Sequence, residues 1–171
     1  MFGIIPIMLK GGRVVITLSP YFYLKGSNFM AEYSAVALQT VDVDDNIIFN
    51  NGFRACRKGF ISHRDDSGIF TLQGARNGCK AIYKVSFQAN IAIATGGTVE
   101  PISIALTLNG ETLGNATAIV TPAAIGDFWS VSAETFIDIP CTCCVTVSVE
   151  NTSDTTAIDV TNANIIFDRV A

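Results

Sequence analysis

Charged residues are scarce in this chain, and their scarcity excludes several kinds of protein. Only 15% of the 171 residues are charged, while 49% are hydrophobic; soluble domains usually carry roughly 25% charged residues. No apolar run approaches the ~20 residues that a helix needs to cross a bilayer, and no basic cluster of the kind that binds nucleic acid is present. A chain with so little charge is expected to hide part of its surface against other subunits.

Catalytic motifs are also missing. The single histidine, His63, precedes Arg64 and the turn-forming segment Asp65–Gly68. Asp and Ser in such a segment usually bond their own backbone, so we interpret His63 as a strand end rather than as part of a nucleophilic triad. No nucleophile elbow, phosphate loop or zinc-protease motif occurs. The sequence therefore predicts that the protein is not an enzyme and needs no cofactor.

The cysteines do not form a recognisable metal site. They are odd in number, so they cannot all pair within one chain: Cys56, Cys79, Cys141, Cys143 and Cys144. Zinc usually takes two spaced pairs of ligands, and here there is one cluster. The apolar Met1–Leu9 segment lacks a basic start and contains Pro6, so it is not a convincing secretory signal. We expect mostly buried thiols in a protein made in a reducing bacterial cytoplasm.

One oxygen-rich segment, Asp42–Asn46, invites a calcium interpretation. It lacks the ligand spacing and the closing glutamate of an EF-hand loop. We therefore predict a solvated turn between two strands, and no metal site in the chain.

What the sequence does contain is strand periodicity. Ala81–Ile93 alternates apolar and polar residues almost without a break, which places one face in a core. Further runs of this kind are separated by turn signals such as Asn109-Gly110, and no window shows a helical period. The predicted strands are 33–41, 46–49, 59–63, 69–73, 79–93, 102–108, 116–120, 128–139, 143–150 and 158–169. Ten strands of this kind predict an all-β jelly-roll sandwich.

The first thirty residues differ from the rest. They carry Lys10, Arg13 and Lys25 but no acid, and they show neither alternation nor a helical face. One interpretation is an irregular arm that is ordered only against a partner. The other is that translation starts at Met30, because Lys25–Met30 can be encoded by a purine-rich ribosome-binding sequence before an ATG. We therefore divide the chain into an N-terminal arm (1–30) and a jelly-roll domain (31–171).

Three segments carry a resemblance to known proteins. Ser67–Leu72 followed by Cys79–Phe87, and Ile104–Gly110 with its Asn-Gly hairpin, resemble the jelly roll of tumour necrosis factor and complement-type globular heads. The closing Ala163–Ala171 is similar to the last strand of spore-surface collagen-like glycoproteins. From Met30 to Ala171 the chain also resembles small stand-alone proteins encoded by phages and prophages of gut Firmicutes.

The resemblance implies a homotrimer. In such proteins the sheet that holds the strands predicted at 79–93, 128–139 and 158–169 packs around a threefold axis. Ile165–Phe167 is apolar on both faces, as expected for a strand that is buried on both sides. Ile82 and Ala92 lie on the face opposite the main apolar stripe of their strand. We therefore expect Ile82, Ala92 and Ile166 at the trimer interface.

The functional expectation follows from the fold and from the missing catalytic set. We expect a structural or interaction protein of a phage particle, namely a capsid decoration, a head fibre or a host-attachment module. Its partners would be its own copies, a capsid or other virion protein reached through residues 1–30, and a host surface glycan. The candidate ligand-binding residues lie in loops: Asp65, Asp66, Gly96, Gly97, Asn109 and Trp129. The alternative is a trimeric adhesin-like protein of a spore or cell surface, which the absence of a Gly-X-Y stalk makes less favourable.

Overall fold

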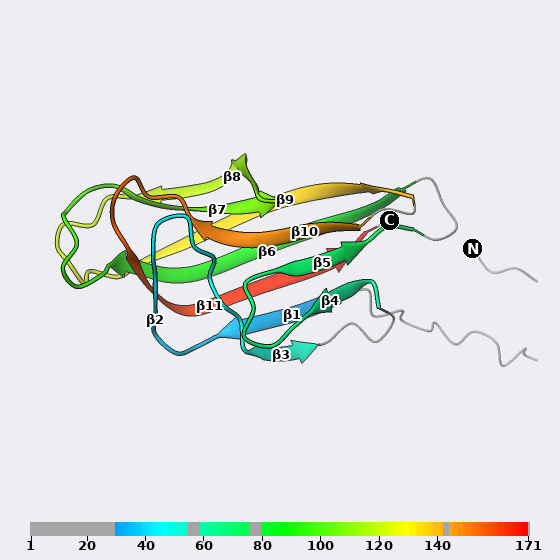
Figure 1. The fold of residues 1–171 in the computed structure, drawn as a ribbon, viewed down its shortest axis with the longest axis horizontal. Coiled ribbons are helices and arrows are strands. Elements are labelled where there is room, and N and C mark those ends of the chain that lie inside the picture. The colour runs from blue at the N-terminus through cyan, green and yellow to red at the C-terminus, as the bar shows by residue number, and fades with distance from the viewer. Residues whose placement is uncertain (1–29, 55–58, 76–79, 142–143, 171) are drawn as a thin grey trace, which may run out of the picture.

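Two antiparallel sheets face each other in the computed structural model, which describes residues 30–54, 59–75, 80–141 and 144–170 (Figure 1). The first sheet has the order β3-β1-β11-β6-β9, with β2 added beside β11, and the second has the order β4-β5-β10-β7-β8. These residues contain no helix, so the predicted all-β sandwich is confirmed. The strands are β1 (Met30–Ala35), β2 (Gln39–Val41), β3 (Asn51–Arg54), β4 (Ile61–His63), β5 (Phe70–Gln73), β6 (Lys80–Ile93), β7 (Ile102–Leu108), β8 (Glu111–Val120), β9 (Trp129–Pro140), β10 (Cys144–Asn151) and β11 (Ile158–Arg169).

The long β6 strand organises the first sheet. It pairs with β9 from Lys80 to Ile91 and with β11 on its other side. The alternation predicted for this strand is present up to Ile91, because every second residue from Ala81 is buried and the residues between them are exposed or half-buried. The first sheet therefore has an inner face in the core and a separate outer face.

The first part of the domain differs from the sequence expectation. The strand predicted at 33–41 is interrupted, because β1 ends at Ala35 and β2 begins at Gln39. The segment predicted as a strand at 46–49 forms only isolated bridges. There the side-chain amide of Gln39 bonds both the N–H and the carbonyl of Ile48, at 2.9 and 3.0 Å, in place of a strand partner. With β3 added, the described residues form eleven strands rather than ten.

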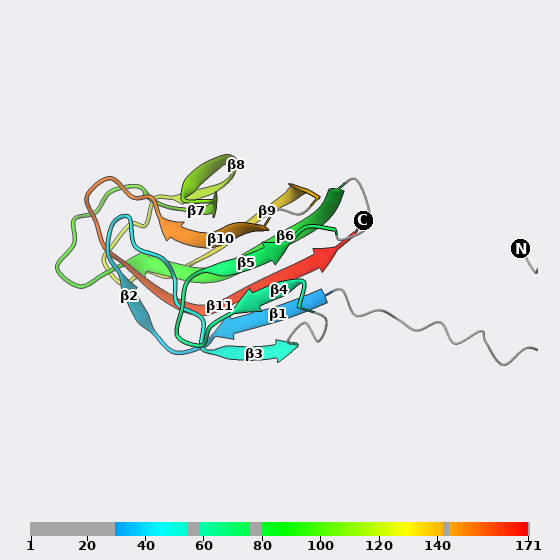
Figure 2. The same ribbon diagram turned by 45° about the vertical axis from the view of Figure 1, so that its right-hand side comes forward.

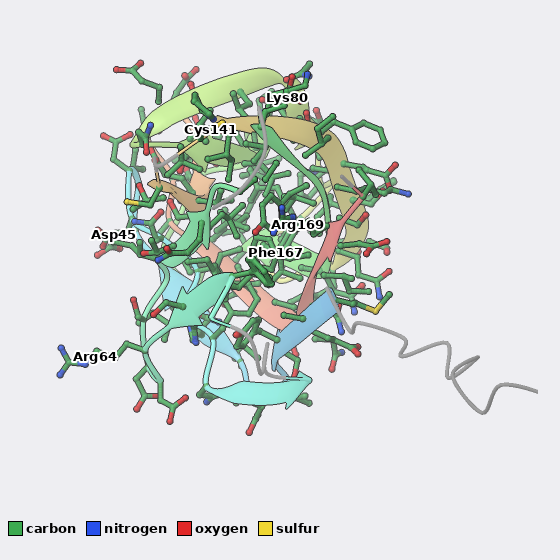
Figure 3. The ribbon with its side chains drawn as sticks, turned by 90° about the vertical axis from the view of Figure 1, so that its right-hand side faces the viewer. Asp45, Arg64, Lys80, Cys141, Phe167 and Arg169 are labelled. Atoms are coloured by element: carbon green, nitrogen blue, oxygen red, sulfur yellow. The ribbon has the colours of Figure 1, made fainter. Side chains whose placement is uncertain are left out.

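An aromatic cluster fills the core between the sheets. The Tyr33 ring lies 4.9 Å from Phe70, and Phe70 lies 4.8 Å from Phe167 and 5.3 Å from Phe49. Phe49, Phe70 and Phe167 are completely buried. Figure 3 shows Phe167 between the sheets. Ring packing of this kind connects strands that are far apart in the sequence.

The two ends of the sandwich are built differently. The loops that follow β6, β8 and β10 gather at one end in both views (Figures 1 and 2). β1 begins at the opposite end, where Met30 pairs with Asp168 near the end of β11. Residues 1–29 of the arm predicted at 1–30 lie outside the described residues, and Met30 is the first residue of β1. Within the described part of the chain, no helix is long and apolar enough to cross a membrane.

Candidate interaction surfaces

The first candidate surface is the outer face of the first sheet. Register places Glu134, Ser86, Ile166 and Glu32 in one row across β9, β6, β11 and β1. Directly opposed residues in antiparallel strands share a face, so these side chains all project from the sandwich. Ser86, Ile166 and Glu32 are half-buried, and Glu134 is exposed. This row is thus mostly polar, with Ile166 as its apolar member.

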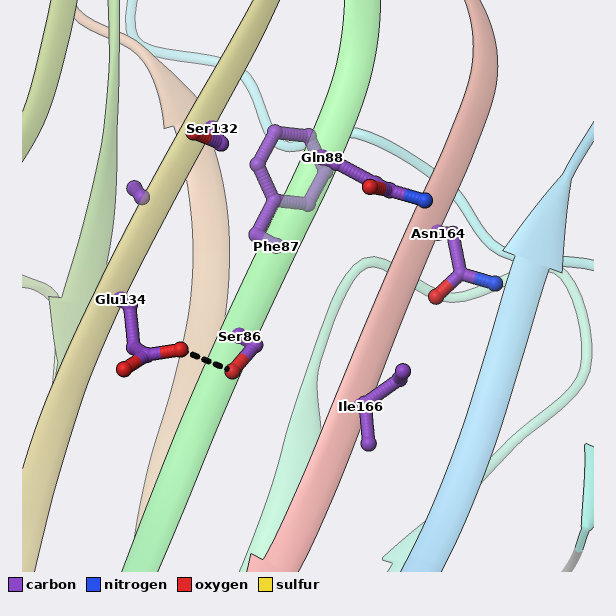
Figure 4. Close-up of a pocket in the computed structure, with 8 residues that line it drawn as sticks. Ser86, Phe87, Gln88, Ser132, Glu134, Asn164 and Ile166 are labelled. Carbon is purple, nitrogen blue, oxygen red and sulfur yellow. Dashed lines mark hydrogen bonds between the residues drawn. The ribbon is translucent and has the colours of Figure 1, made fainter.

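A shallow hollow of about 240 Å³ lies in this face (Figure 4). Its lining residues come from the three adjacent strands β6, β9 and β11: Ser86, Phe87, Gln88, Ser132, Ala133, Glu134, Asn164 and Ile166. Asn164 donates its amide to Glu32 at 3.0 Å, while its oxygen is turned toward β6 (Figure 4). The hollow therefore combines an apolar wall from Ile166 with amide and hydroxyl groups.

Two oxygens on this face are buried without a partner. Within the described part of the chain, neither Asn164 Oδ1 nor Ser34 Oγ has a hydrogen bond, and these two residues pair directly across β1 and β11. A buried acceptor that has lost its water costs about 1–3 kcal/mol unless a donor reaches it. Both oxygens therefore lie beneath the outer face, where the described residues supply them with no hydrogen-bond partner.

Charge on the outer face is concentrated along β6 and β9. Lys84 lies 3.0 Å from Glu134, and Lys80 contacts Asp138 at 2.6 Å. A hydrogen bond from Ser86, followed by the bond and charge of Lys84, lowers the pKa of Glu134 below its ordinary value. Both ion pairs are exposed to solvent, so water and salt screen them and they contribute little to stability.

The structure separates the three residues predicted for a trimer interface. Ile82 and Ile166 lie on the outer face and are half-buried. Ala92 is 0% exposed within the single chain, so it has no surface left to offer a second copy. Sequence reasoning missed Phe136, which is 61% exposed in β9, the strand at the edge of the sheet. The sequence could have indicated this exposure, because Phe136 lies between Glu134 and Asp138 on the polar side of an alternating strand.

The second candidate surface is the end formed by the loops after β6, β8 and β10. Gly96 and Gly97 lie in the first of these loops, and Trp129 follows the second. Gly126 N donates to Ile93 O at 3.1 Å, which joins the second loop to the end of β6, where the first loop begins. A Cβ at Gly97 would lie 2.8 Å from methyl carbons of Ile93 and Thr156, so the close packing of this loop on the third requires glycine. The structure thus brings Gly96, Gly97 and Trp129 to one end.

Asp65 and Asp66 lie elsewhere. Their turn closes with a bond from Ser67 N to Arg64 O, and Asp66 adopts a positive φ of 60°. Phe49 N donates to Ser67 O at 3.2 Å, which places the turn on the flank of the sandwich rather than at the loop end. Arg64 beside them extends away from the protein (Figure 3).

Asn109 has a structural role at the far end of β7. Asn109 and Gly110 have φ values of 53° and 83°, as a two-residue hairpin requires, so the predicted hairpin is confirmed. The Asn109 side chain also accepts a hydrogen bond from Thr146 N at 2.9 Å, which fixes the hairpin on β10. The six predicted ligand-binding residues therefore do not form one site.

His63 contacts a core aromatic ring and a backbone carbonyl. Its ring stacks on Phe70 with centroids 4.3 Å apart, and its Nε2 lies 2.9 Å from Ser67 O. These contacts agree with a strand end followed by a turn. Within the described ranges, no group of three or more histidine, cysteine, aspartate or glutamate side chains is arranged to hold a metal ion.

The cysteines are less buried than expected where the structure describes them. Cys141 is half-buried, and Cys144 is exposed because it alternates with the buried Val145 at the start of β10. The other cysteines, Cys56, Cys79 and Cys143, lie outside the described residues. The Asp42–Asn46 segment forms a turn, with Asp45 N bonded to Asp42 O at 3.1 Å and Asp44 at a φ of 65°.

Solved structures with the same arrangement of strands were found by structural comparison. The Eiger tumour necrosis factor of S. frugiperda superposes with a TM-score of 0.59 at 14% identity, over 84% of this chain and 92% of that one. Murine APRIL at pH 5.0 gives a TM-score of 0.57 at 10% identity, over 82% of this chain and 99% of the other. The globular domain of the zebrafish complement 1qA protein gives 0.52 at 9% identity, over 83% and 97%.

The fold is the jelly roll of tumour necrosis factor and complement 1q globular domains. At these identities the likeness concerns the fold alone. No protein-family model matches the sequence, and no curated protein matches it. None of the three superposed structures is named as an enzyme.

Proposed function

We propose that the protein is a non-enzymatic homotrimeric interaction module of a phage particle, which serves as a capsid decoration, a head fibre or a host-attachment module. The observation that carries the self-association is the outer face of the first sheet. This face exposes Phe136 and presents the half-buried side chains of Ile82 and Ile166. Packing against a second copy would remove these apolar groups from water.

Several further properties support this proposal. Charge is low at 15%, as expected for a chain that covers much of its surface by assembly. The sequence resemblance to stand-alone phage-encoded jelly rolls supports the assignment to a virus particle. β1 begins at the end opposite the loop cluster. An arm that docks on the capsid would therefore leave the loops directed outward.

The assembly is tested by replacing one isoleucine on each outer surface. Ile166→Asp puts a carboxylate into the proposed interface and is expected to convert a trimer of the 18.2 kDa chain into monomers. Ile119→Asp is the matched control, because Ile119 is 68% exposed on β8 of the other sheet. Light scattering after gel filtration measures both masses. A monomeric wild-type protein, or equal masses for the wild type and Ile166→Asp, would contradict the proposed interface.

The place in a particle is tested by mass spectrometry of virions purified after induction of the host cells. We expect the protein in the particles, and the same experiment reports its N-terminus. A start at Met1 supports a docking arm, whereas a start at Met30 removes it. Absence from particles, with the protein found in the cell-surface fraction, would favour the surface adhesin instead.

A further inference from the structure

Exposed aromatic side chains are concentrated at the loop end of the sandwich. Phe128 and Trp129, at the junction of the β8–β9 loop and β9, are 45% and 46% exposed. Ile125 in the same loop and Val99 in the β6–β7 loop are also exposed. Exposed apolar groups that gather in one place commonly mark a binding site, whereas single ones need no explanation.

The loops that present these rings are tied to one another. Besides the bond from Gly126 N to Ile93 O, Ala94 N donates to Ala157 O at 3.1 Å. The Thr155 hydroxyl donates to Glu100 at 2.8 Å, which connects the loops after β10 and β6. A surface that is already fixed loses little conformational entropy when a ligand binds.

The Trp129 ring is itself oriented. Its Nε1 donates to Asp127 Oδ2 at 3.3 Å, and its backbone lies opposite Ile91 in the sheet. This bond holds the indole next to a carboxylate that has further lone pairs for hydroxyl donors. Three consecutive residues thus supply two exposed rings and an acceptor, and the acceptor is bonded to one of these rings.

The charged residues of the loops after β6, β8 and β10 make some classes of ligand less favourable. Residues 94–101, 121–128 and 152–157 contain no lysine and no arginine, and their charged residues are Glu100, Asp127 and Asp154. Polyanions such as nucleic acids, anionic lipids and acidic glycans are normally recognised through basic side chains. The loop end therefore disfavours these ligands and offers aromatic faces beside hydrogen-bond acceptors.

A neutral sugar fits this combination. A pyranose ring presents an apolar face of C–H groups and a rim of hydroxyls, so it can lie on an aromatic ring while its hydroxyls donate to carboxylates. We propose that the loop end binds a neutral glycan, with Trp129 and Phe128 as stacking residues and Asp127 as the hydroxyl acceptor. This inference names a ligand class for the proposed attachment role. Its biological purpose rests on the proposed function, whereas sugar binding itself can be tested without it.

Binding is measured on the purified full chain. Trp129 is the single tryptophan, so intrinsic fluorescence reports directly on the site. The probes are neutral oligosaccharides of hexoses, deoxyhexoses and N-acetylhexosamines, together with sialylated and uronic-acid-containing counterparts. We expect at least one neutral oligosaccharide to change the emission saturably, and its acidic counterpart to bind more weakly.

Variants assign the contact, with calorimetry as the readout because Trp129→Ala removes the fluorophore. Trp129→Ala and Phe128→Ala are each expected to weaken binding about tenfold or more, as for other aromatic hot spots. Trp129→Tyr should retain part of the affinity, because a ring remains. Ile119→Ala is the matched control: it removes an exposed apolar side chain from β8 and should bind as the wild type does.

Three results would overturn the proposal: no binding by any neutral oligosaccharide of the panel, unchanged binding by both alanine variants, or a change of molecular mass in Trp129→Ala. The last result would identify the patch as an interface between copies of the chain. The phage assignment can fail independently of the sugar site. If the protein binds a neutral sugar but is absent from virions, the site proposed here is supported and only the assignment to a phage particle is contradicted.

Discussion

Asn151 donates a hydrogen bond from its side-chain amide to the carbonyl of Val41, 110 positions earlier in the sequence, at 3.0 Å. The same amide donates to Thr156 O at 3.2 Å, and the Asn151 oxygen accepts from Ser153 N at 3.0 Å. Asn151 is completely buried. One side chain thus connects β2, the end of β10 and the loop that leads into β11.

Replacement of Asn151 by alanine is expected to destabilise the fold strongly. The change would leave two carbonyls and one N–H in the interior without this partner, and each such loss costs about 1 kcal/mol or more. We expect a decrease of about 3 kcal/mol in the free energy of unfolding. Urea titration at one fixed protein concentration measures it, because an assembly makes stability depend on concentration. A decrease below about 1 kcal/mol would show that water replaces the amide at this position.

Gly97 gives a second prediction, which concerns the packing of the loop end. A methyl group there would lie 2.8 Å from Ile93 Cγ2 and Thr156 Cγ2. Gly97→Ala is therefore expected to cost about 1–3 kcal/mol through overpacking. The measurement is the denaturant midpoint with an unchanged slope.

Gly114→Ala is the matched control for Gly97. A Cβ at Gly114 in β8 meets nothing within 4 Å, and its φ is not positive. The same substitution should be neutral there, or stabilising by about 0.4–1 kcal/mol, because alanine restricts the unfolded chain. Equal losses at both positions would contradict the steric explanation.

A third prediction concerns pH. Burial, and then the charge of Asp44, raise the pKa of Glu150 above its ordinary value. A raised pKa in the folded state means that the ionised carboxylate opposes folding, and that this penalty disappears as the pH falls through the raised pKa. Glu150→Gln should therefore raise the melting temperature at pH 7, by roughly 1 °C because the group is partly solvated. The difference from the wild type should vanish at acidic pH.

Glu100→Gln should behave in the opposite way. Hydrogen bonds from Thr156 and Thr155 lower the pKa of Glu100, so its contribution to stability is present above the ordinary pKa of a glutamate and is lost as the pH falls. This variant should melt slightly below the wild type at pH 7. Calorimetric scans of both variants at several pH values decide the signs, and a shift of the same sign in both would contradict the assigned environments.

Much of the sandwich could be predicted from side-chain alternation. β7 and β11 have the predicted bounds, β6 ends at the predicted Ile93, and β9 differs from prediction by a single residue at each end. These strands alternate clearly because they have one face in the core. β8 begins at Glu111 rather than at 116, since the polar residues at its start carry no apolar alternation.

The surfaces were harder to predict because burial depends on the whole fold. Ala92 lies on the expected outer face of β6 yet is fully covered within the chain, whereas Phe136 is exposed among charged neighbours. The turn at Asp66 and the hairpin at Asn109 were recognisable from local chemistry, but their distance from the loop end was not. Turn residues have local signals, while the grouping of loops depends on topology.

A buried pair of hydroxyls gives the last prediction. Thr107 Oγ1 and Ser148 Oγ are 2.6 Å apart in adjacent strands β7 and β10, and the residues are 1% and 7% exposed. Thr107→Val or Ser148→Ala would leave the other hydroxyl without this partner, so each is expected to cost about 1–2 kcal/mol. Removing both hydroxyls leaves none stranded, so the double variant should cost about 1 kcal/mol less than the sum of the single variants. Urea unfolding of the four proteins gives this coupling energy, and additive losses would show that the two hydroxyls stabilise the fold independently.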